Sequence, residues 1–203
     1  MENVSYKKSQ FSDGELQEIA GLHQRWIPSG FLTSLGSEFL ARMYASIAES
    51  PAGVLIAAKD PDNKVVGFIS GTTSIRSIYQ HLVSHHFVFL VLLVLKFVFS
   101  VKTLIRILED KQYSTQDHPG AENISAELLS IVVDERLRGE GIAPGLFKEL
   151  SGAFREKGVE KFKIIVGSQL IQAQKFYLKT GAVKVAEIEL HHGQRSFVYQ
   201  SAV

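Results

Sequence analysis

The stretch that decides the fold of this chain is Leu128–Ala143, which reads LLSIVVDERLRGEGIA. It opens with an apolar run typical of a buried β-strand and passes into a turn that contains Gly139 and Gly141. From Pro144 onward the pattern is that of an α-helix, and proline is well tolerated in a first helical turn. A strand, a glycine-containing turn and a helix N-terminus together present backbone N–H groups and the positive end of a helix dipole. The stretch therefore predicts a binding site for phosphate or pyrophosphate.

The residues of the turn exclude two common phosphate-binding motifs. A dinucleotide-binding motif needs a third glycine where this chain has Pro144, and a P-loop needs Gly-Lys-Ser/Thr, which is absent. What remains is RGEGIA over residues 138–143, which fits the pattern Gln/Arg-x-x-Gly-x-Gly/Ala. This pattern resembles the acyl-coenzyme-A pyrophosphate loop of the GNAT acetyltransferase superfamily.

A second segment carries the same resemblance. Residues 173–182, AQKFYLKTGA, are similar to the family's Ala-x-x-Phe-Tyr-x-Lys-x-Gly-Phe segment, with Ala182 in place of the final aromatic residue. The family often has an asparagine where this chain has Leu170, although Ser168 and Gln169 lie nearby. The resemblance is strong over residues 126–182, the predicted acyl-coenzyme-A-binding core.

Hydrophobic periodicity predicts the other elements. Ser12 or Asp13 is expected to cap the first helix. The predicted helices cover 13–27, 35–49, 141–157 and 170–179, and the predicted strands cover 54–58, 64–71, 127–133, 162–166, 182–190 and 196–201. The fold class is α/β (α+β). The resemblance implies a mixed, mostly antiparallel sheet of seven strands with helices on both faces, splayed open between the fourth and fifth strands.

Composition limits the class of protein. The chain has 22 Lys+Arg against 21 Asp+Glu, a balance that argues against a nucleic-acid partner. It has no cysteine, which excludes disulfides, thiolate nucleophiles and cysteine-ligated zinc. We therefore expect a single soluble, cytoplasmic domain over 1–203 with a helical insertion at 76–121.

The insertion contains an unusually apolar run, Phe87–Val101, in which thirteen of fifteen residues are apolar. Lys96 interrupts it, and a membrane span needs about 20 apolar residues, so no membrane span is expected. The run is interpreted as a substrate-side cap or a homodimer contact, with a membrane-surface patch as a third possibility. His81 and His85 share a helix face, but no carboxylate completes a ligand set with them and no metal is expected.

The resemblance also implies a mechanism. Tyr177 resembles the family tyrosine that protonates the departing thiolate; a half-buried helix tyrosine with a satisfied hydroxyl is the alternative. Glu127 matches a glutamate that serves some members as general base; a solvated carboxylate at a strand end is the alternative. Strand alternation is expected to place Glu127 on one face with Leu129, Ile131 and Val133. The implied acetyl-coenzyme-A-binding residues are Ile131, Val132, Val133, Arg138, Gly139, Glu140, Gly141, Ile142, Ala143 and Tyr177.

These observations predict an N-acetyltransferase that moves an acetyl group from acetyl-coenzyme A to a primary amine of a small molecule by direct attack. The acceptor is expected near residues 23–36, the insertion and the hairpin at 190–195. An amino-sugar or nucleotide-sugar amine, a peptide N-terminus and a polyamine all remain open. A non-catalytic acyl-coenzyme-A sensor and an aminoacyl-transferring relative are the alternative functions.

Overall fold

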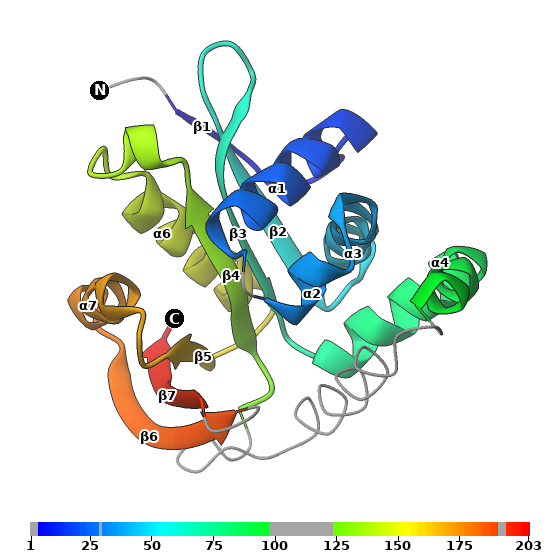
Figure 1. Ribbon diagram of the computed structural model, residues 1–203. Helices are drawn as coiled ribbons and strands as arrows, with labels where there is room; N and C mark the ends of the chain where they lie inside the picture. The colour runs from blue at the N-terminus through cyan, green and yellow to red at the C-terminus, as the bar shows by residue number, and fades with distance from the viewer. Residues whose placement is uncertain (1–3, 29, 98–123, 191–193) are drawn as a thin grey trace.

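A seven-stranded sheet lies between two layers of helices in the computed structural model, which describes residues 4–28, 30–97, 124–190 and 194–203 (Figure 1). The strand order is β1-β2-β3-β4-β5-β7-β6, and all neighbours are antiparallel except β4 and β5. The predicted mixed, mostly antiparallel sheet is therefore confirmed. The strands are β1 Ser5–Lys7, β2 Gly53–Lys59, β3 Val65–Thr72, β4 Glu127–Val133, β5 Lys161–Gly167, β6 Val183–Leu190 and β7 Gln194–Ala202.

The helices divide between the two faces of the sheet. In Figure 1, α1 to α4 lie on one side of it and α6 and α7 on the other. The helices are α1 Asp13–Trp26, α2 Phe31–Ser34, α3 Ser37–Glu49, α4 Ile75–Phe97, α6 Ile142–Glu156 and α7 Ile171–Lys179, with a 3-10 turn η1 at Glu135–Leu137. Two elements, β1 and α2, were not predicted from the pattern. The predicted helix over 35–49 begins two residues later, because Gly36 has a φ of +95° and is the N-cap of α3.

Each face of the sheet has its own hydrophobic cluster. Under α6, the side chains of Leu146, Leu150 and Phe154 are fully buried against the strands. Under α3, Leu40 and Tyr44 are equally buried in a second cluster that also includes residues of α1 and α4. The sheet is therefore covered on both faces, and its strands read as near-continuous apolar runs.

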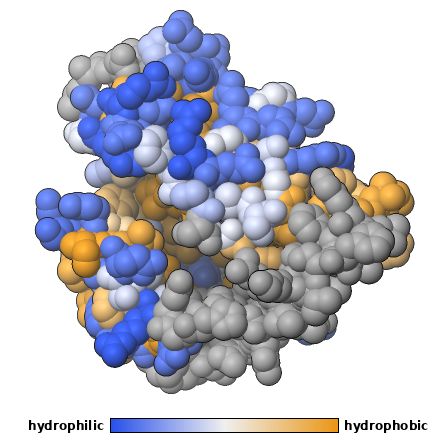
Figure 2. Space-filling model, viewed as in Figure 1, coloured by the Kyte–Doolittle hydropathy of each residue, from blue (hydrophilic) through white to orange (hydrophobic). Residues whose placement is uncertain are grey.

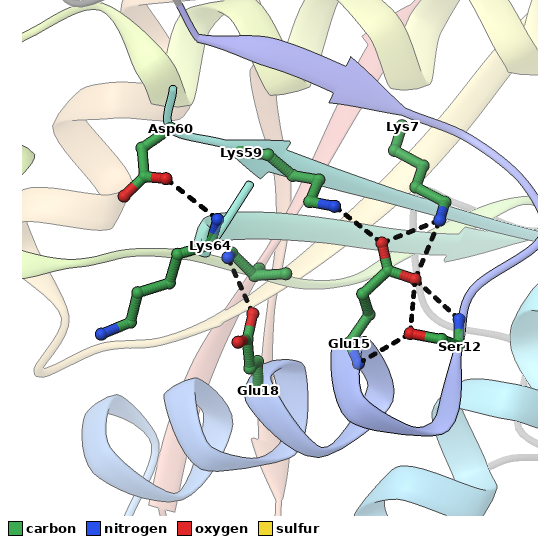
Figure 3. Close-up of polar contacts among 8 residues, drawn as sticks. Lys7, Ser12, Glu15, Glu18, Lys59, Asp60 and Lys64 are labelled. Carbon is green, nitrogen blue, oxygen red and sulfur yellow. Dashed lines mark hydrogen bonds and ion pairs between the residues drawn. The ribbon is translucent and has the colours of Figure 1, made fainter. Parts of the chain in front are cut away.

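Polar contacts fasten the start of α1 to the edge of the sheet (Figure 3). Ser12 caps α1 as expected: the Glu15 N–H donates to its Oγ at 3.3 Å, and the Ser12 N–H donates to the Glu15 carboxylate at 2.6 Å. The same carboxylate accepts hydrogen bonds from Lys7 of β1 and Lys59 of β2, each at 2.8 Å. Burial raises the pKa of Glu15, but the bonds from Lys59, Lys7 and Ser12 outweigh it and lower the pKa to about 2.

The helix α4 is the described part of the predicted insertion. It is kinked at His86, which has non-helical dihedral angles (φ −125°, ψ 24°). One side of α4 packs on the cluster under α3, and the other exposes the apolar residues Val83, Phe87, Val88, Val91 and Leu92. No helix within the described ranges is long and apolar enough to cross a membrane. Residues 98–121 of the insertion lie outside those ranges, so the cap, the homodimer contact and the membrane-surface patch stay predictions.

Candidate active site

The strands β4 and β5 separate soon after they meet and open a cleft in the sheet. Only two residue pairs join them, Glu127 with Lys163 and Leu128 with Ile164. Beyond these pairs β4 continues beside β3 and β5 beside β7. Figure 2 shows a hollow, walled mostly by hydrophobic surface, between α7 and the helices of the opposite layer. The predicted splay between the fourth and fifth strands is confirmed.

A β-bulge interrupts β4 within this cleft. Ser130 pairs with Ser70 of β3, and Leu128 pairs with Gly71, so Leu129 has no partner of its own on β3. An extra residue of this kind leaves two successive side chains out of the usual alternation. The bulge lies next to the edge that β5 leaves unpaired.

The bulge overturns the expected arrangement of side chains on β4. Ile131 and Val133 pack in the cluster under α6, whereas Leu129 and Val132 pack in the cluster under α3. Glu127 therefore does not share a face with Ile131 and Val133, as strict alternation predicted. The physical reason is that one additional residue moves every later side chain to the other face.

Glu127 points away from α6. Its neighbour Leu128 contributes to the cluster under α6, and so does Ile164 of β5. Because side chains alternate on both sides of these residues, Glu127 and Lys163 project to the opposite face, the face covered by α1 and α3. The two charged side chains lie directly beside each other on the last paired rung before the strands separate.

The environment of Glu127 favours proton transfer near neutral pH. Only 7% of the residue is exposed, and the Lys163 Nζ lies 3.8 Å from its Oε2. Burial raises the pKa of the Glu127 carboxyl to about 7, against the lowering effect of the Lys163 ammonium. The alternative of a solvated carboxylate at a strand end is wrong, because Glu127 is buried.

Tyr177 lies within the aromatic packing between α6, α7 and β7. It is 4% exposed, and its ring contacts those of Phe147, Phe176 and Tyr199. Burial raises the pKa of its hydroxyl, so the phenol keeps its proton at every working pH. The alternative of a half-buried tyrosine is wrong on this point, because Tyr177 is buried. Tyr177 belongs to the cluster under α6, and Glu127 belongs to the opposite face of the sheet.

The loop between β4 and α6 has the backbone geometry that its sequence predicted. Gly139 and Gly141 have φ values of +93° and +82°, a left-handed conformation that favours glycine. A Cβ at either position would meet nothing within 4 Å, so the space above the loop is open. Gly141 is the N-cap of α6, and no side chain of the described residues caps the helix, so the N–H groups of the first turn have no intrahelical partners. Pro144 lies in that turn, as expected.

The two arginines of this loop are held differently. The Arg136 guanidinium donates two hydrogen bonds to the Asp134 carboxylate, at 3.1 Å from Nε and 2.9 Å from Nη2. These hydrogen bonds from Arg136 lower the pKa of Asp134 to about 2. The guanidinium of Arg138 instead lies over the ring of Trp26, with its Cζ 4.5 Å from the ring centroid. Among the described residues, no hydrogen bond or ion pair uses the Arg138 guanidinium.

Three polar residues near the cleft, two of them buried, were missed by the sequence interpretation. His23 Nδ1 lies 2.5 Å from the hydroxyl of Tyr44, which also has a hydrogen bond to Ser130 beside the bulge. Burial lowers the pKa of His23 to about 4, so the imidazole is neutral at pH 7. These residues come from α1, α3 and β4, and no sequence spacing connects them. The predicted hairpin turn at 191–193 lies outside the described residues.

A splayed sheet beside a glycine loop and a helix N-terminus with free N–H donors forms a site that suits a pyrophosphate, the group that acyl-coenzyme-A-dependent transferases must hold. The sequence matches the acetyltransferase (GNAT) family over residues 18–182. The chain belongs to this family: it is an N-acetyltransferase, and acetyl-coenzyme A is its co-substrate. The predicted family and co-substrate are confirmed.

Solved structures of other acetyltransferases share the fold. The chain is similar to NAA60 of Arabidopsis thaliana in complex with acetyl-coenzyme A, at 13% identity and a TM-score of 0.62 over 99% of each chain. It is similar to an N-acetyltransferase of Staphylococcus aureus, at 13% identity and a TM-score of 0.63 over 98% of each chain. The spermidine/spermine N-acetyltransferase SpeG of Vibrio cholerae gives 12% identity and a TM-score of 0.57, covering 98% of this chain and 95% of that one. No curated protein matches the sequence.

Proposed function

We propose that this enzyme transfers the acetyl group of acetyl-coenzyme A directly to a primary amine of a small molecule, with an amino sugar as the first candidate. The observation that carries the proposal is the buried Glu127 carboxyl, with a pKa of about 7, at the point where β4 and β5 separate. A base of this strength is half ionised near neutral pH, which suits the removal of an amine proton. Glu127 acts through a water molecule.

The loop and β4 would position the co-substrate. The residues present fit its pyrophosphate, because the loop is open above Gly139 and Gly141 and the first turn of α6 offers free N–H donors. Arg138 adds a positive charge, and the backbone of residues 131–133 offers an unpaired edge to the pantetheine arm. When bound, acetyl-coenzyme A supplies an activated thioester carbonyl.

Glu127 and Tyr177 take opposite roles at that carbonyl. Glu127 accepts the proton from the attacking amine as the new N–C bond forms, and the C–S bond breaks to release the thiolate. Tyr177, whose phenol keeps its proton, donates a hydrogen bond to the departing sulfur and assists its protonation. The step needs no covalent enzyme intermediate and no metal, and positioning supplies much of the acceleration.

The charge at the apex of the cleft, the point where β4 and β5 separate, supports an acceptor with a single amine. Glu127 is accompanied there by the ammonium of Lys163, so the apex has no excess of negative charge to hold a polycation. A polyamine is for this reason a poorer acceptor than an amine on a neutral, hydroxylated body.

A panel of amines tests the proposal. Thiol release from acetyl-coenzyme A would be measured with amino sugars, nucleotide-sugar amines, polyamines and peptides with free N-termini. We expect turnover with one of the sugar amines and none with polyamines. Turnover confined to peptides or polyamines would contradict the acceptor class. Binding of acetyl-coenzyme A with no turnover on any amine would contradict the enzymatic role of Glu127 and Tyr177.

A further inference from the structure

The contact between Trp26 and Arg138 joins two parts of the enzyme that the sequence keeps far apart. Trp26 is the last residue of α1, and Arg138 opens the glycine loop that precedes α6. The Arg138 Cζ lies 4.5 Å from the centroid of the indole ring, within the range of a cation–π interaction. Arg25, the neighbour of Trp26, also acts electrostatically on Asp134 at the other end of the loop.

A guanidinium that stacks on a ring keeps its hydrogen-bond donors. The N–H bonds lie in the plane of the guanidinium, so a ring over its flat face leaves them free. In Arg138, no hydrogen bond or ion pair with the described residues uses them. Arg136, two residues away, has its Nε and Nη2 bonded to Asp134. Arg138 is therefore the arginine of this loop whose fork is both oriented and free for the two oxygens of a phosphate.

We propose that Trp26 is a positioning residue for the co-substrate, holding the Arg138 guanidinium in place to bind the pyrophosphate. The inference rests on the proposed binding of pyrophosphate by the loop and names a residue outside it. An ordered guanidinium loses less side-chain entropy on binding than a mobile one, which is the source of the gain in affinity. The end of α1 thereby takes part in holding the co-substrate.

The experiment is a double-mutant cycle in the affinity for acetyl-coenzyme A, measured by calorimetry without any acceptor. Trp26→Leu is expected to weaken binding about fivefold, the size of a cation–π contact at a partly exposed site. Trp26→Phe retains a ring and should stay within about twofold of the parent. In an Arg138→Gln background, Trp26→Leu should cause no further loss, because the group that it positions is gone. Arg136→Gln, in the same loop, is the matched control. In this background Trp26→Leu should weaken binding as much as it does in the parent.

A truncated ligand separates positioning from a general structural effect. S-acetylpantetheine lacks the pyrophosphate, so Trp26→Leu should leave its affinity unchanged. Trp26 is also the single tryptophan of the chain, so its fluorescence should change on addition of acetyl-coenzyme A and should not change in Arg138→Gln.

Three results would overturn the inference: no loss in Trp26→Leu, an equal loss in the Arg138→Gln background, or an equal loss for S-acetylpantetheine. Unfolding temperatures of all variants identify a loss that is caused by misfolding. In that case the Trp26 fluorescence serves as the test, and an equal change in the parent and in Arg138→Gln overturns the inference. If the parent protein does not bind acetyl-coenzyme A at all, the proposed function fails together with this inference. Tight binding with no dependence on Trp26 overturns the inference alone.

Discussion

Glu15 and Glu127 are both largely withdrawn from water beside lysines, and their carboxyl groups behave in opposite ways. Glu15 has two ammonium donors at 2.8 Å and the N-cap N–H at 2.6 Å, and its pKa falls to about 2. Glu127 has one ammonium at 3.8 Å, and its pKa rises to about 7. The number and closeness of the donors therefore decide whether a buried carboxyl stays ionised or titrates near neutral pH.

Glu127→Gln should have the largest effect, because it removes the group that we propose as the base for the amine proton. We expect kcat for acetyl transfer to fall by about a hundredfold or more, with acetyl-coenzyme-A affinity retained. Steady-state kinetics on the best amine of the panel, with calorimetry for binding, measure both quantities. Glu15→Gln is the matched control and should keep kcat near that of the parent. Equal kcat values for the two variants would remove the distinction between the carboxyl groups.

Glu15→Gln should instead lower the stability of the fold. The amide replaces charge-assisted hydrogen bonds and leaves Lys7 and Lys59 without their anion, a loss of about 2 kcal/mol in the free energy of unfolding. Urea titrations measure this quantity.

The pH dependence of stability distinguishes the two groups further. Because the pKa of Glu15 is lower in the folded state, its contribution is complete above about pH 4.5 and is lost as the pH falls toward 2. The raised pKa of Glu127 acts with the opposite sign: its contribution declines as the pH rises from 4.5 through 7. Stability of Glu15→Gln that matches the parent at pH 7 would contradict the anchoring role.

Lys163→Met tests what the single lysine does for Glu127. Without the ammonium, the pKa of Glu127 should rise above 7, so the acid limb of the kcat/KM profile should move to higher pH by about one unit. Lys163→Arg should return the limb toward its original position. Lys161→Met, at an exposed lysine of the same strand, is the control and should not move it. An unchanged limb in Lys163→Met would show that Lys163 does not act on the catalytic proton.

Ser12→Ala should have the smallest effect, because it removes one member of the Glu15 network and leaves both lysines. The loss of an N-cap hydroxyl costs about 1 kcal/mol of stability. Thermal or urea unfolding measures the loss, and Ser12→Thr, which keeps a hydroxyl, should restore most of it. A loss of stability as large as that of Glu15→Gln would mean that the Ser12 hydroxyl, rather than the two lysines, accounts for the stabilisation around Glu15.

The sequence predicted best those features that residues close together along the chain form by themselves. The left-handed glycines of the loop, the helix that follows them and the segment around Tyr177 are all continuous stretches, so their patterns could be interpreted directly. Ser12 as a cap was equally local.

The remaining features depend on partners that are distant along the chain. The strand β1 is three residues long and has no alternation of its own; it forms because the edge of β2 accepts it. Lys163 meets Glu127 only through the register of two parallel strands, and Trp26 meets Arg138 only across the fold. The pKa values that separate Glu15 from Glu127 follow from such contacts, so no sequence pattern could give them.

The bulge at Leu129 shifts the alternation of side chains along β4, so the residues before and after it face different sides of the sheet than strict alternation would give. On one side of it, residues 131–133 offer backbone to the cleft, while on the other side Glu127 projects its carboxyl toward the layer of α1 and α3. A strand of the same seven residues in strict alternation, with Ile131 and Val133 still in the cluster under α6, would have the same composition and hydrophobicity. It would nevertheless turn the carboxyl toward α6, among Leu150 and Phe154, and away from any acceptor on the other face. A single residue without a pairing partner therefore places the carboxyl of Glu127, the proposed base, on the opposite face of the sheet from Ile131 and Val133.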